Sequence, residues 1–292
     1  MSVLLDDIKH LQFEPMKNHT TFRIGGPAKH FYMPASVEEL ILVIEACRKS
    51  NEKYMILGNG SNVLFMDQGY DGVIIQIYSN MNSIKIEDDV IYAEAGALLS
   101  KVASFARDNE LTGMEFAAGI PGTLGGAVVM NAGAYGGEMK DIIEYVDILE
   151  EDLTVKRYLC DEMEFGYRHS IVEGSKVVLG AAIKLDKGDV ESINKKMAEL
   201  KEARVSKQPL EYPSAGSTFK RPEGYFAGKL IEDSGLKGYS VGGAMVSTKH
   251  SGFVINYDNA TSSDVLTLIS DVQNVVYDKY GVKLEPEVRI IT

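Results

Sequence analysis

Apolar residues recur at the spacing of an α-helix in six parts of the chain. After Ser36 they lie three or four positions apart, and Ser36 and Glu39 have the spacing of a capping box. The side chains predicted to face the core there are Leu40, Val43, Ile44 and Cys47. The same periodicity predicts the other helices, at residues 4–11, 98–109, 189–205, 227–234 and 263–280. Ser263 is expected to cap the last helix, and Gly281 to end it.

Two of these helices have a predicted buried face. The expected core residues are Leu98, Val102 and Phe105 or Ala106 in the first, and Val190, Ile193, Met197 and Leu200 in the second. Short apolar runs predict strands, with a hairpin across Asp88 and Asp89. The predicted strands are residues 54–57, 73–77, 84–87, 90–93, 145–149, 154–159, 177–185, 244–246, 252–256 and 287–291. Because strands and helices do not alternate strictly, the pattern indicates an α+β fold.

Composition narrows the class of protein. The chain has 292 residues, of which 45% are hydrophobic and 25% charged, so it can bury a core without disulfides. Its formal charge of −12 argues against general nucleic-acid binding. The same charge means that an anionic substrate must find local positive charge.

The sequence also predicts a compartment. We expect no membrane insertion and a cytoplasmic protein, because there is no signal peptide and no run of about 18 apolar residues. The two cysteines, Cys47 and Cys160, are expected to be reduced thiols. No metal site is expected, since no Cys/His cluster has the spacing of one.

Chemistry is suggested first by residues 116–137, a stretch without charge in which glycine recurs. Glycine lets the backbone adopt positive φ and pass close to a ligand, and consecutive N–H groups can hold an anion. The alternative is a tight buried turn that binds nothing. The spacing G-x-x-G-x-x-G-G matches neither a P-loop nor a dinucleotide fingerprint. A second glycine turn, residues 57–62, directly follows a predicted strand, and two such loops suit a ligand with a pyrophosphate and a flat ring system.

Three polar residues elsewhere are candidates for catalysis, each with an ordinary alternative. Ser217 lies in a loop, where serine is usually a turn or cap residue. Arg168 is either a solvated charge or a planar fork for a carboxylate. Glu287, in a predicted terminal strand, is either a surface residue or a functional carboxylate.

These motifs together resemble the UDP-N-acetylenolpyruvoylglucosamine reductases. The similarity lies in LGNGSN (57–62), AAGIPGTLGGAVVMNAGAYGG (117–137), GYR (166–168), SAGSTFK (214–220) and LEPEVR (284–289), in the same order along the chain. It therefore covers nearly the whole sequence. The chain is similar to the shorter subclass of the family, because there is no evident room for the extra tyrosine-bearing loop that covers the substrate in the longer one.

The resemblance implies a fold and a division into domains. The fold is that of the vanillyl-alcohol-oxidase-like flavoproteins, with two α+β subdomains that bind FAD and a small C-terminal α+β substrate domain. The FAD-binding domain is expected at residues 1–187 and the substrate domain at residues 188–292. The residues implied in cofactor binding are Leu57, Gly58, Asn59, Gly60, Ser61, Asn62, Gly119, Gly122, Thr123, Gly125, Gly126, Ala127, Asn131, Gly133 and Ala134.

The resemblance also implies a reaction in bacterial peptidoglycan synthesis. NADPH reduces FAD, and hydride then passes to UDP-N-acetylglucosamine enolpyruvate, which becomes UDP-N-acetylmuramate. Ser217 would supply the proton, while Arg168 and Glu287 would flank the enolpyruvyl group. The implied partners are this substrate and NADPH, and the sequence does not define the oligomeric state.

Substrate binding is expected mainly from cations of the C-terminal part, although scattered solubilising lysines are the alternative. The candidates are Tyr167, Lys220, Arg221, Lys229 and Lys249. Arg221 stands where many relatives have asparagine, which leaves its role open. Two other functions stay possible on these residues. One is a flavin oxidase of the same fold that acts on a small alcohol or hydroxy acid, and the other is a non-catalytic nucleotide-sugar-binding module.

Overall fold

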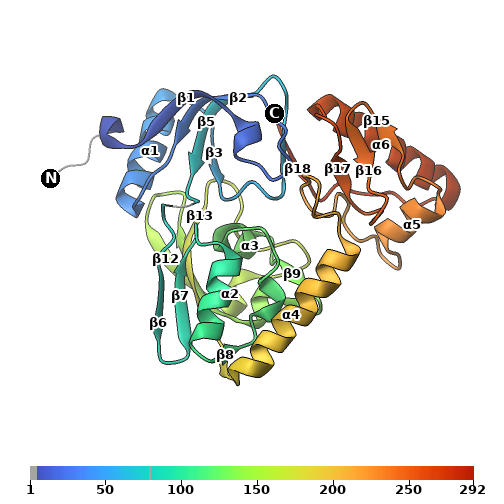
Figure 1. Cartoon of the computed structure of the whole chain (residues 1–292). Coiled ribbons are helices and arrows are strands. Elements are labelled where there is room, and N and C mark those ends of the chain that lie inside the picture. The colour runs from blue at the N-terminus through green and yellow to red at the C-terminus, as the bar shows by residue number, and fades with distance from the viewer. Residues whose placement is uncertain (1–4, 79) are drawn as a thin grey trace. The chain divides into compact units, whose positions relative to one another are not determined.

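The computed structural model describes residues 5–78 and 80–292 (Figure 1). The backbone divides into two compact units. The first unit contains the residues up to Leu11 together with 31–59 and 73–204, and the second contains 12–30, 60–72 and 205–292. Each unit has a hydrophobic core of its own. The mixture of sheets and helices in both units confirms the α+β class.

A five-stranded antiparallel sheet forms the centre of the first unit, in the order β12-β11-β13-β7-β6. Its strands are β6 (Ile84–Glu87), β7 (Val90–Glu94), β11 (Ile143–Leu149), β12 (Val155–Leu159) and β13 (Val177–Lys184). The central strand, β13, is buried along its length except at Lys184, which explains its unbroken apolar sequence. Gly180 lies where a Cβ atom would be 2.5 Å from the hydroxyl of Tyr92, so the neighbouring tyrosine requires glycine. All five strands were predicted to within a few residues.

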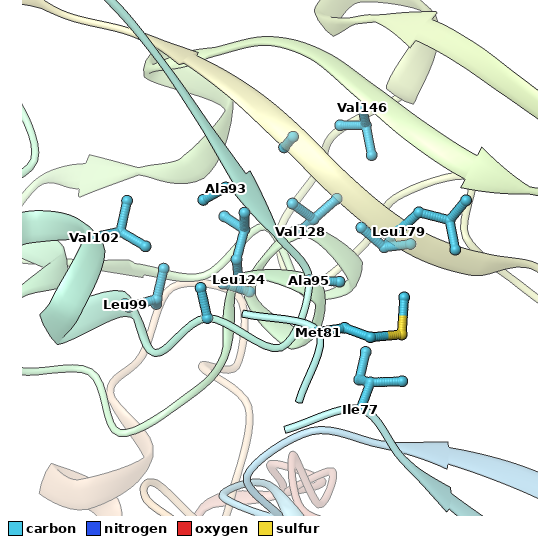
Figure 2. Packing of buried hydrophobic residues seen from close by; sticks show 14 of the residues in the cluster. Ile77, Met81, Ala93, Ala95, Leu99, Val102, Leu124, Val128, Val146 and Leu179 are labelled. Carbon is cyan, nitrogen blue, oxygen red and sulfur yellow. The ribbon is translucent and has the colours of Figure 1, made fainter. Parts of the chain in front are cut away.

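Two helices of the first unit, α2 (Leu99–Asp108) and α3 (Leu124–Val129), contribute to the core beside this sheet (Figure 1). Figure 2 shows side chains of both helices within one cluster that also contains sheet residues. The labelled members from the helices are Leu99, Val102, Leu124 and Val128, and those from the sheet region include Ala93, Ala95, Val146 and Leu179. The prediction that Leu98 belongs to this core was wrong, because α2 begins one residue later and Leu98 is its half-buried N-cap.

A second sheet has the order β1-β2-β5-β3 and is accompanied by α1 (Val37–Ser50). Its strands are β1 (His10–Pro15), β2 (Pro27–Tyr32), β3 (Tyr54–Leu57) and β5 (Tyr70–Gln76), of which β3 and β5 are parallel. The predicted cap of α1 is confirmed, since the Ser36 hydroxyl accepts a hydrogen bond from the backbone N–H of Glu39 at 3.2 Å. The Glu39 carboxylate accepts from the N–H of Ala35 at 2.7 Å, one residue before the position that a capping box would give.

The predicted helix at 4–11 is wrong over the described residues. Leu5–Asp7 forms only a 3₁₀ turn, η1, and Leu11 lies in strand β1. Position 4 lies outside the described residues. A single turn of apolar residues is too short to form a stable helix, and the strand gains backbone hydrogen bonds from the sheet.

The remaining elements of the first unit are short, apart from α4 (Val190–Lys207), which continues past Arg204. They are β8 (Leu111–Thr112), β9 (Gly133–Ala134), β10 (Gly137–Glu138), β14 (Asp186–Lys187), η3 (Glu115–Ala117), η4 (Met139–Asp141) and η5 (Cys160–Met163). The predicted apolar stripe of α4 is buried only at Ile193, whereas Val190 is exposed. Most of this helix is therefore held by a few contacts and by its own backbone.

The second unit contains a three-stranded sheet, two helices and a parallel strand pair. These elements are β15 (Ser240–Val241), β16 (Ala244–Val246), β17 (Val254–Asn256), α5 (Ala227–Asp233), α6 (Ser262–Tyr280), β4 (Val63–Phe65) and β18 (Arg289–Ile291), with η2 (Met16–Asn18). The cap of α6 is Thr261 and not Ser263, and Asp264 completes its capping box. Gly281 ends α6 in the left-handed conformation, at φ 68°, as predicted.

Segments far apart in the sequence meet inside the second unit. The Asp67 carboxylate accepts hydrogen bonds from the backbone N–H of Ser262, at 2.9 and 3.0 Å, and from its hydroxyl, at 2.8 Å. The hydroxyl of Thr21 donates to the carbonyl of Ser214 at 2.7 Å. N-terminal residues thereby fix the backbone that leads to Ser217.

In the described part of the chain, no helix combines the length and apolarity needed to cross a bilayer.

Candidate active site

The first part of the 57–62 loop contacts the second glycine loop within the first unit. The side-chain amide of Asn59 donates a hydrogen bond to the carbonyl of Pro121 at 2.6 Å. A Cβ atom at Gly58 would lie 2.3 Å from the hydroxyl oxygen of Thr123, so the loops approach at a distance that only glycine permits. Leu57, at the end of β3, is buried beneath them. The two loops are therefore in direct contact.

Thr123 has a buried hydroxyl at the junction of the two loops. The residue is 1% exposed, and its Oγ1 atom has no hydrogen-bond partner among the residues that the structure describes. Such an atom costs free energy unless something pairs with it. A Cβ atom at Gly126 would meet nothing closer than this same oxygen, at 3.8 Å. An orphaned hydroxyl and an open glycine thus face the same small space, which fits a polar ligand such as FAD.

Other glycines of the stretch serve packing. The backbone N–H groups of Leu124 and Gly125 donate to the carbonyls of Ala97 and Ala95, both at 2.8 Å, so they are not available to an anion. A Cβ atom at Gly125 would lie 2.9 Å from that of Ala95. The carbonyl of Gly122 accepts from Leu99 in the same way, at 3.1 Å, and Ala127 is buried in the core. This part of the stretch is therefore held by contacts within the protein.

Asn131 organises the segment that follows. It is 2% exposed and has φ 40°, a conformation that asparagine tolerates better than most residues. Its side-chain amide donates to the carboxylate of Glu138 at 2.7 Å and to the carbonyl of Gly166 at 3.2 Å. Its Oδ1 accepts from the backbone N–H of Lys140 at 2.9 Å. All polar atoms of this side chain thus have partners in the protein.

A two-residue hairpin displays Tyr135 next to Gly133 and Ala134. Strands β9 and β10 pair Ala134 with Gly137, and the turn residues have φ 53° at Tyr135 and 90° at Gly136. A Cβ atom at Gly133 would lie 2.7 Å from the carbonyl oxygen of Gly137. The tyrosine, nearly half exposed, is thereby held at the tip of a rigid turn.

The end of the first glycine loop, Gly60 to Asn62, belongs to the second unit. Gly60 has φ 61°, and its carbonyl accepts from the N–H of Thr21 at 3.2 Å. Asn62 donates from its side chain to the carbonyl of Glu287 at 3.3 Å and accepts from the N–H of Arg289 at 3.0 Å. Ser61, half-buried, lies between these two anchors. The loop is fixed at both ends before any ligand binds.

Arg168 lies on a tight turn in the first unit. Gly166 and His169 exchange backbone hydrogen bonds of 3.1 and 3.3 Å, which leaves Tyr167 and Arg168 as the two central residues. Arg168 has φ 56°, and its guanidinium carbon lies 5.2 Å from the centre of the Tyr167 ring. Because Asn131 holds the carbonyl of Gly166, the turn is tied to the glycine stretch.

Ser217 lies in a segment of the second unit that is held on both sides. The N–H of Thr218 donates to the carbonyl of Gly252, and its hydroxyl accepts from the N–H of Val254, both at 2.9 Å. On the other side, the carbonyl of Thr218 accepts from the N–H of Glu287 at 2.8 Å. The Ser217 hydroxyl is half-buried and makes no hydrogen bond within the described part of the chain.

This pairing brings Ser217 and Glu287 to neighbouring positions although they are 70 residues apart. Glu287 was expected inside a strand, but β18 begins only at Arg289, because Glu287 pairs with Thr218 instead of with β4. Arg168 belongs to the first unit, whereas Ser217 and Glu287 belong to the second.

Thr218, which holds the Ser217 segment by hydrogen bonds, was not singled out in the sequence. A lone threonine gives no signal for this structural role.

The predicted substrate lysines all have acidic neighbours. The ammonium groups lie 3.3 Å from Glu285 for Lys220, 2.5 Å from Asp233 for Lys229 and 3.7 Å from Glu211 for Lys249. The bond to Asp233 raises the pKa of Lys229. An anionic substrate would have to compete with these carboxylates. The guanidinium carbon of Arg221 lies 4.0 Å from the centre of the ring of Phe226, which is 61% exposed.

The other groups that the sequence singled out are Tyr167 and the two cysteines. Tyr167 is 57% exposed on its turn. Among the residues that the structure describes, no cluster of three His, Cys, Asp or Glu side chains could hold a metal ion. Cys47 is buried and Cys160 half-buried, both without a disulfide, and burial raises the pKa of Cys47 to about 11.

Two family models match the chain. A FAD binding domain model matches residues 28–158, which include both glycine loops. A model of the C-terminal domain of UDP-N-acetylenolpyruvoylglucosamine reductase matches residues 208–291, which include Ser217 and Glu287. The fold, the paired glycine loops and these matches define an FAD-binding flavoprotein oxidoreductase.

Curated relatives narrow this class to one family. The UDP-N-acetylenolpyruvoylglucosamine reductase of Caldanaerobacter subterraneus is 55% identical over 95% of this chain and 92% of its own length. That of Clostridium perfringens is 52% identical over 95% of this chain and 91% of its own. The solved reductase (MurB) from Thermus caldophilus has a TM-score of 0.84 and 35% identity, covering 98% of this chain and 99% of that one. The chain belongs to the family of UDP-N-acetylenolpyruvoylglucosamine reductases, and the expected flavoprotein fold is confirmed.

Proposed function

We propose that this protein reduces UDP-N-acetylglucosamine enolpyruvate to UDP-N-acetylmuramate with NADPH, in the cytoplasm and for peptidoglycan synthesis. The names of the relatives support the substrate, and their sequence similarity extends over nearly the whole chain. The same names do not favour the flavin oxidase. FAD, when bound, would carry hydride from NADPH to the substrate.

The observation that best supports cofactor binding is the buried hydroxyl of Thr123. It lacks a partner among the described residues and lies where Gly58 and Gly126 leave room on the backbone. Residues 57–62 and 119–134 are proposed to hold FAD, with Thr123 donating or accepting one hydrogen bond. Leu124 and Gly125 would contribute shape and not N–H groups, because theirs are donated to Ala97 and Ala95.

Three residues are proposed to act on the substrate. Hydride addition to the vinyl carbon leaves negative charge on the adjacent carbon and its carboxylate, and that carbon must gain a proton. The Ser217 hydroxyl, which has no intramolecular hydrogen bond within the described residues, would donate it. Arg168 would stabilise the developing charge and Glu287 would flank the enolpyruvyl group, each on a backbone fixed by hydrogen bonds.

Lys220 is a poor candidate to assist Ser217. Lys220 is already paired with Glu285, at 3.3 Å. We also propose that residues 1–187 bind FAD and that residues 188–292 bind the substrate. Tyr167, from the first part, would contribute to the substrate site.

The visible absorbance spectrum of the purified protein tests this function. Bound flavin should give a yellow protein that NADPH bleaches and that the enolpyruvyl substrate reoxidises under nitrogen. The variant Thr123→Val removes the orphaned hydroxyl at nearly constant volume. We expect it to weaken FAD binding about 10-fold, the effect of one lost hydrogen bond of about 1.5 kcal/mol, while leaving the apoprotein folded.

Each rival gives a different result in the same experiment. A non-catalytic nucleotide-sugar-binding module would be colourless as purified. An oxidase would be reduced by a small alcohol and reoxidised rapidly by oxygen. Unchanged FAD affinity in Thr123→Val would remove this hydroxyl from the cofactor site.

A further inference from the structure

Arg204 is a half-buried cation beside the glycine stretch. It lies in the last turn of α4, and its side chain runs across the backbone of Gly119. A Cβ atom at Gly119 would lie 3.0 Å from Cδ of Arg204 and 3.2 Å from Nη1. Glycine at position 119 therefore lets the guanidinium group approach the loop. The sequence patterns gave no signal for this residue, since it is one of many charges on a polar helix.

The guanidinium group of Arg204 has no hydrogen bond or ion pair with any residue in the described ranges. Burial lowers its pKa, and an electrostatic interaction with the nearby Tyr135 opposes this shift. Tyr135 lies at the tip of the hairpin that carries Gly133 and Ala134. Arg204 is thus placed among residues expected to contact the cofactor and is not paired with an acidic side chain.

Three other cations of the first unit are paired with carboxylates. Arg157 forms two hydrogen bonds with the carboxylate of Asp147, at 2.8 and 2.9 Å. Lys140 lies 2.6 Å from Glu138, and Lys176 lies 3.4 Å from Glu150. The chain has 42 acidic and 30 basic side chains, so acidic partners are abundant. A partly buried charge without one is unfavourable unless a ligand compensates it.

We propose that Arg204 binds the diphosphate of a nucleotide at the glycine stretch. A diphosphate suits the site because its oxygens accept the parallel N–H bonds of a guanidinium fork. Lys220, Lys229 and Lys249 are already paired with carboxylates, whereas Arg204 is not. The inference rests on the proposed function, which brings two kinds of diphosphate to this protein, that of FAD and that of the nucleotide substrates.

The two sources are separated by measuring each affinity on the same variant. FAD dissociation is followed by the fluorescence of free flavin as the holoprotein is diluted. Binding of UDP and of NADP to the holoprotein is followed by calorimetry. We expect Arg204→Gln to weaken one of these affinities about 10- to 100-fold, the loss of one or two charge-assisted hydrogen bonds. Arg204→Lys should recover part of the loss, because it keeps the charge but not the fork.

Two further variants make the result specific. Lys201→Gln removes an exposed charge of the same helix and should leave every affinity unchanged. Gly119→Ala keeps the arginine but displaces it from the loop, so it should weaken the same affinity as Arg204→Gln. If Arg204→Gln does not fold, Arg204→Lys and Gly119→Ala decide the question, with folding followed by circular dichroism.

Each outcome has one meaning. Weaker FAD binding assigns the diphosphate to the cofactor, and weaker UDP or NADP binding with unchanged FAD assigns it to a substrate. Affinities that stay within about twofold in every folded variant at position 204 would overturn the inference. They would do so without touching the proposed function, which fails only if the wild-type protein holds no flavin or does not turn over.

Discussion

The glycine loops of the first unit and the Ser217 segment of the second are organised by different physics. In the loops, close packing of backbone against neighbouring residues sets the geometry: a Cβ atom at Gly58 would lie 2.3 Å from Oγ1 of Thr123, and one at Gly125 would lie 2.9 Å from Cβ of Ala95. Around Ser217, hydrogen bonds between remote segments set the geometry, through Gly252, Val254 and Glu287. One region is specified by local sequence and the other by long-range pairing.

The difference has a consequence for how each region tolerates change. A side chain added at Gly58 or Gly125 would lie within 3 Å of another protein atom, whereas one added at Gly126 would meet no protein atom closer than 3.8 Å. A side chain removed at Ser217 leaves the segment in place, since the backbone and the Thr218 hydroxyl make its contacts. Mutations at Gly125 should therefore affect the fold, mutations at Gly126 should affect flavin binding, and mutations at Ser217 should affect chemistry alone.

The largest effect is expected for Ser217→Ala. It should keep FAD and its reduction by NADPH, but slow reoxidation of the reduced flavin by the enolpyruvyl substrate by at least about 10²-fold, the lower end of what a positioned acid contributes. Stopped-flow absorbance measures the two half-reactions separately. Near-normal reoxidation would exclude Ser217 as the proton donor. Equal loss of both half-reactions would point to a structural role and would break the contrast between the two regions.

Loss of bound flavin is expected for Gly126→Val, with a smaller effect for Gly126→Ala. A Cβ atom at Gly126 meets no protein atom closer than 3.8 Å, so both variants should fold and only the ligand should be displaced. The ratio of flavin to protein absorbance measures occupancy, and circular dichroism measures folding. Gly125→Ala is the matched comparison, because it collides with Ala95 and should destabilise the protein itself. Full flavin occupancy in Gly126→Val would contradict the assignment of this loop to the FAD site.

Much of the first unit, including its glycine loops, could be predicted from the sequence. The strand at 54–57, the helix capped by Ser36 and the glycine loops all follow from local patterns, and each is present. The sequence could not show which glycines pack against other residues and which have open space beside them, because Ala95 and Ala97 approach from outside the motif. Arg204 was missed for the same reason, since its neighbour Gly119 lies 85 positions away in the sequence.

The second unit could be predicted only in outline. Its helices have capping and periodicity signals, although the cap of α6 was placed at Ser263 and lies at Thr261. No local pattern indicates that residues 12–30 and 60–72 belong to the same compact unit as 205–292. Such pairings depend on single hydrogen bonds, for example between Asp67 and Ser262, whose partners are 195 residues apart. A fragment that ends at Asp186 would separate these partners, so its folding is a sensitive test of the proposed division into domains.

A moderate loss of stability is expected for Asp67→Ala. The change removes the carboxylate that accepts from the N–H and the hydroxyl of Ser262 in the first turn of α6. We expect the free energy of unfolding to fall by about 1–2 kcal/mol, the range for a lost helix cap, with flavin occupancy unchanged. Urea titration monitored by circular dichroism measures it, and Asp71→Ala, on an exposed residue of β5, is the control. A simultaneous loss of flavin would show that the two regions depend on each other more than their separate cores suggest.

The smallest effect is expected from pH at Asp264. Hydrogen bonds from the backbone N–H groups of Thr261 and Gly243, at 2.9 and 3.2 Å, hold the pKa of this carboxyl below its ordinary value. A carboxyl whose folded pKa is lowered stabilises the protein above its unfolded pKa, near 4, and loses that contribution as pH falls through the folded pKa. Asp264→Asn should therefore lower the urea midpoint at pH 7 by an amount that shrinks toward pH 3. Because this is a capping bond near the surface, the difference should stay below about 1 kcal/mol. A difference that stays constant from pH 7 to pH 3 would show that shape, and not charge, makes Asp264 the partner of this helix end.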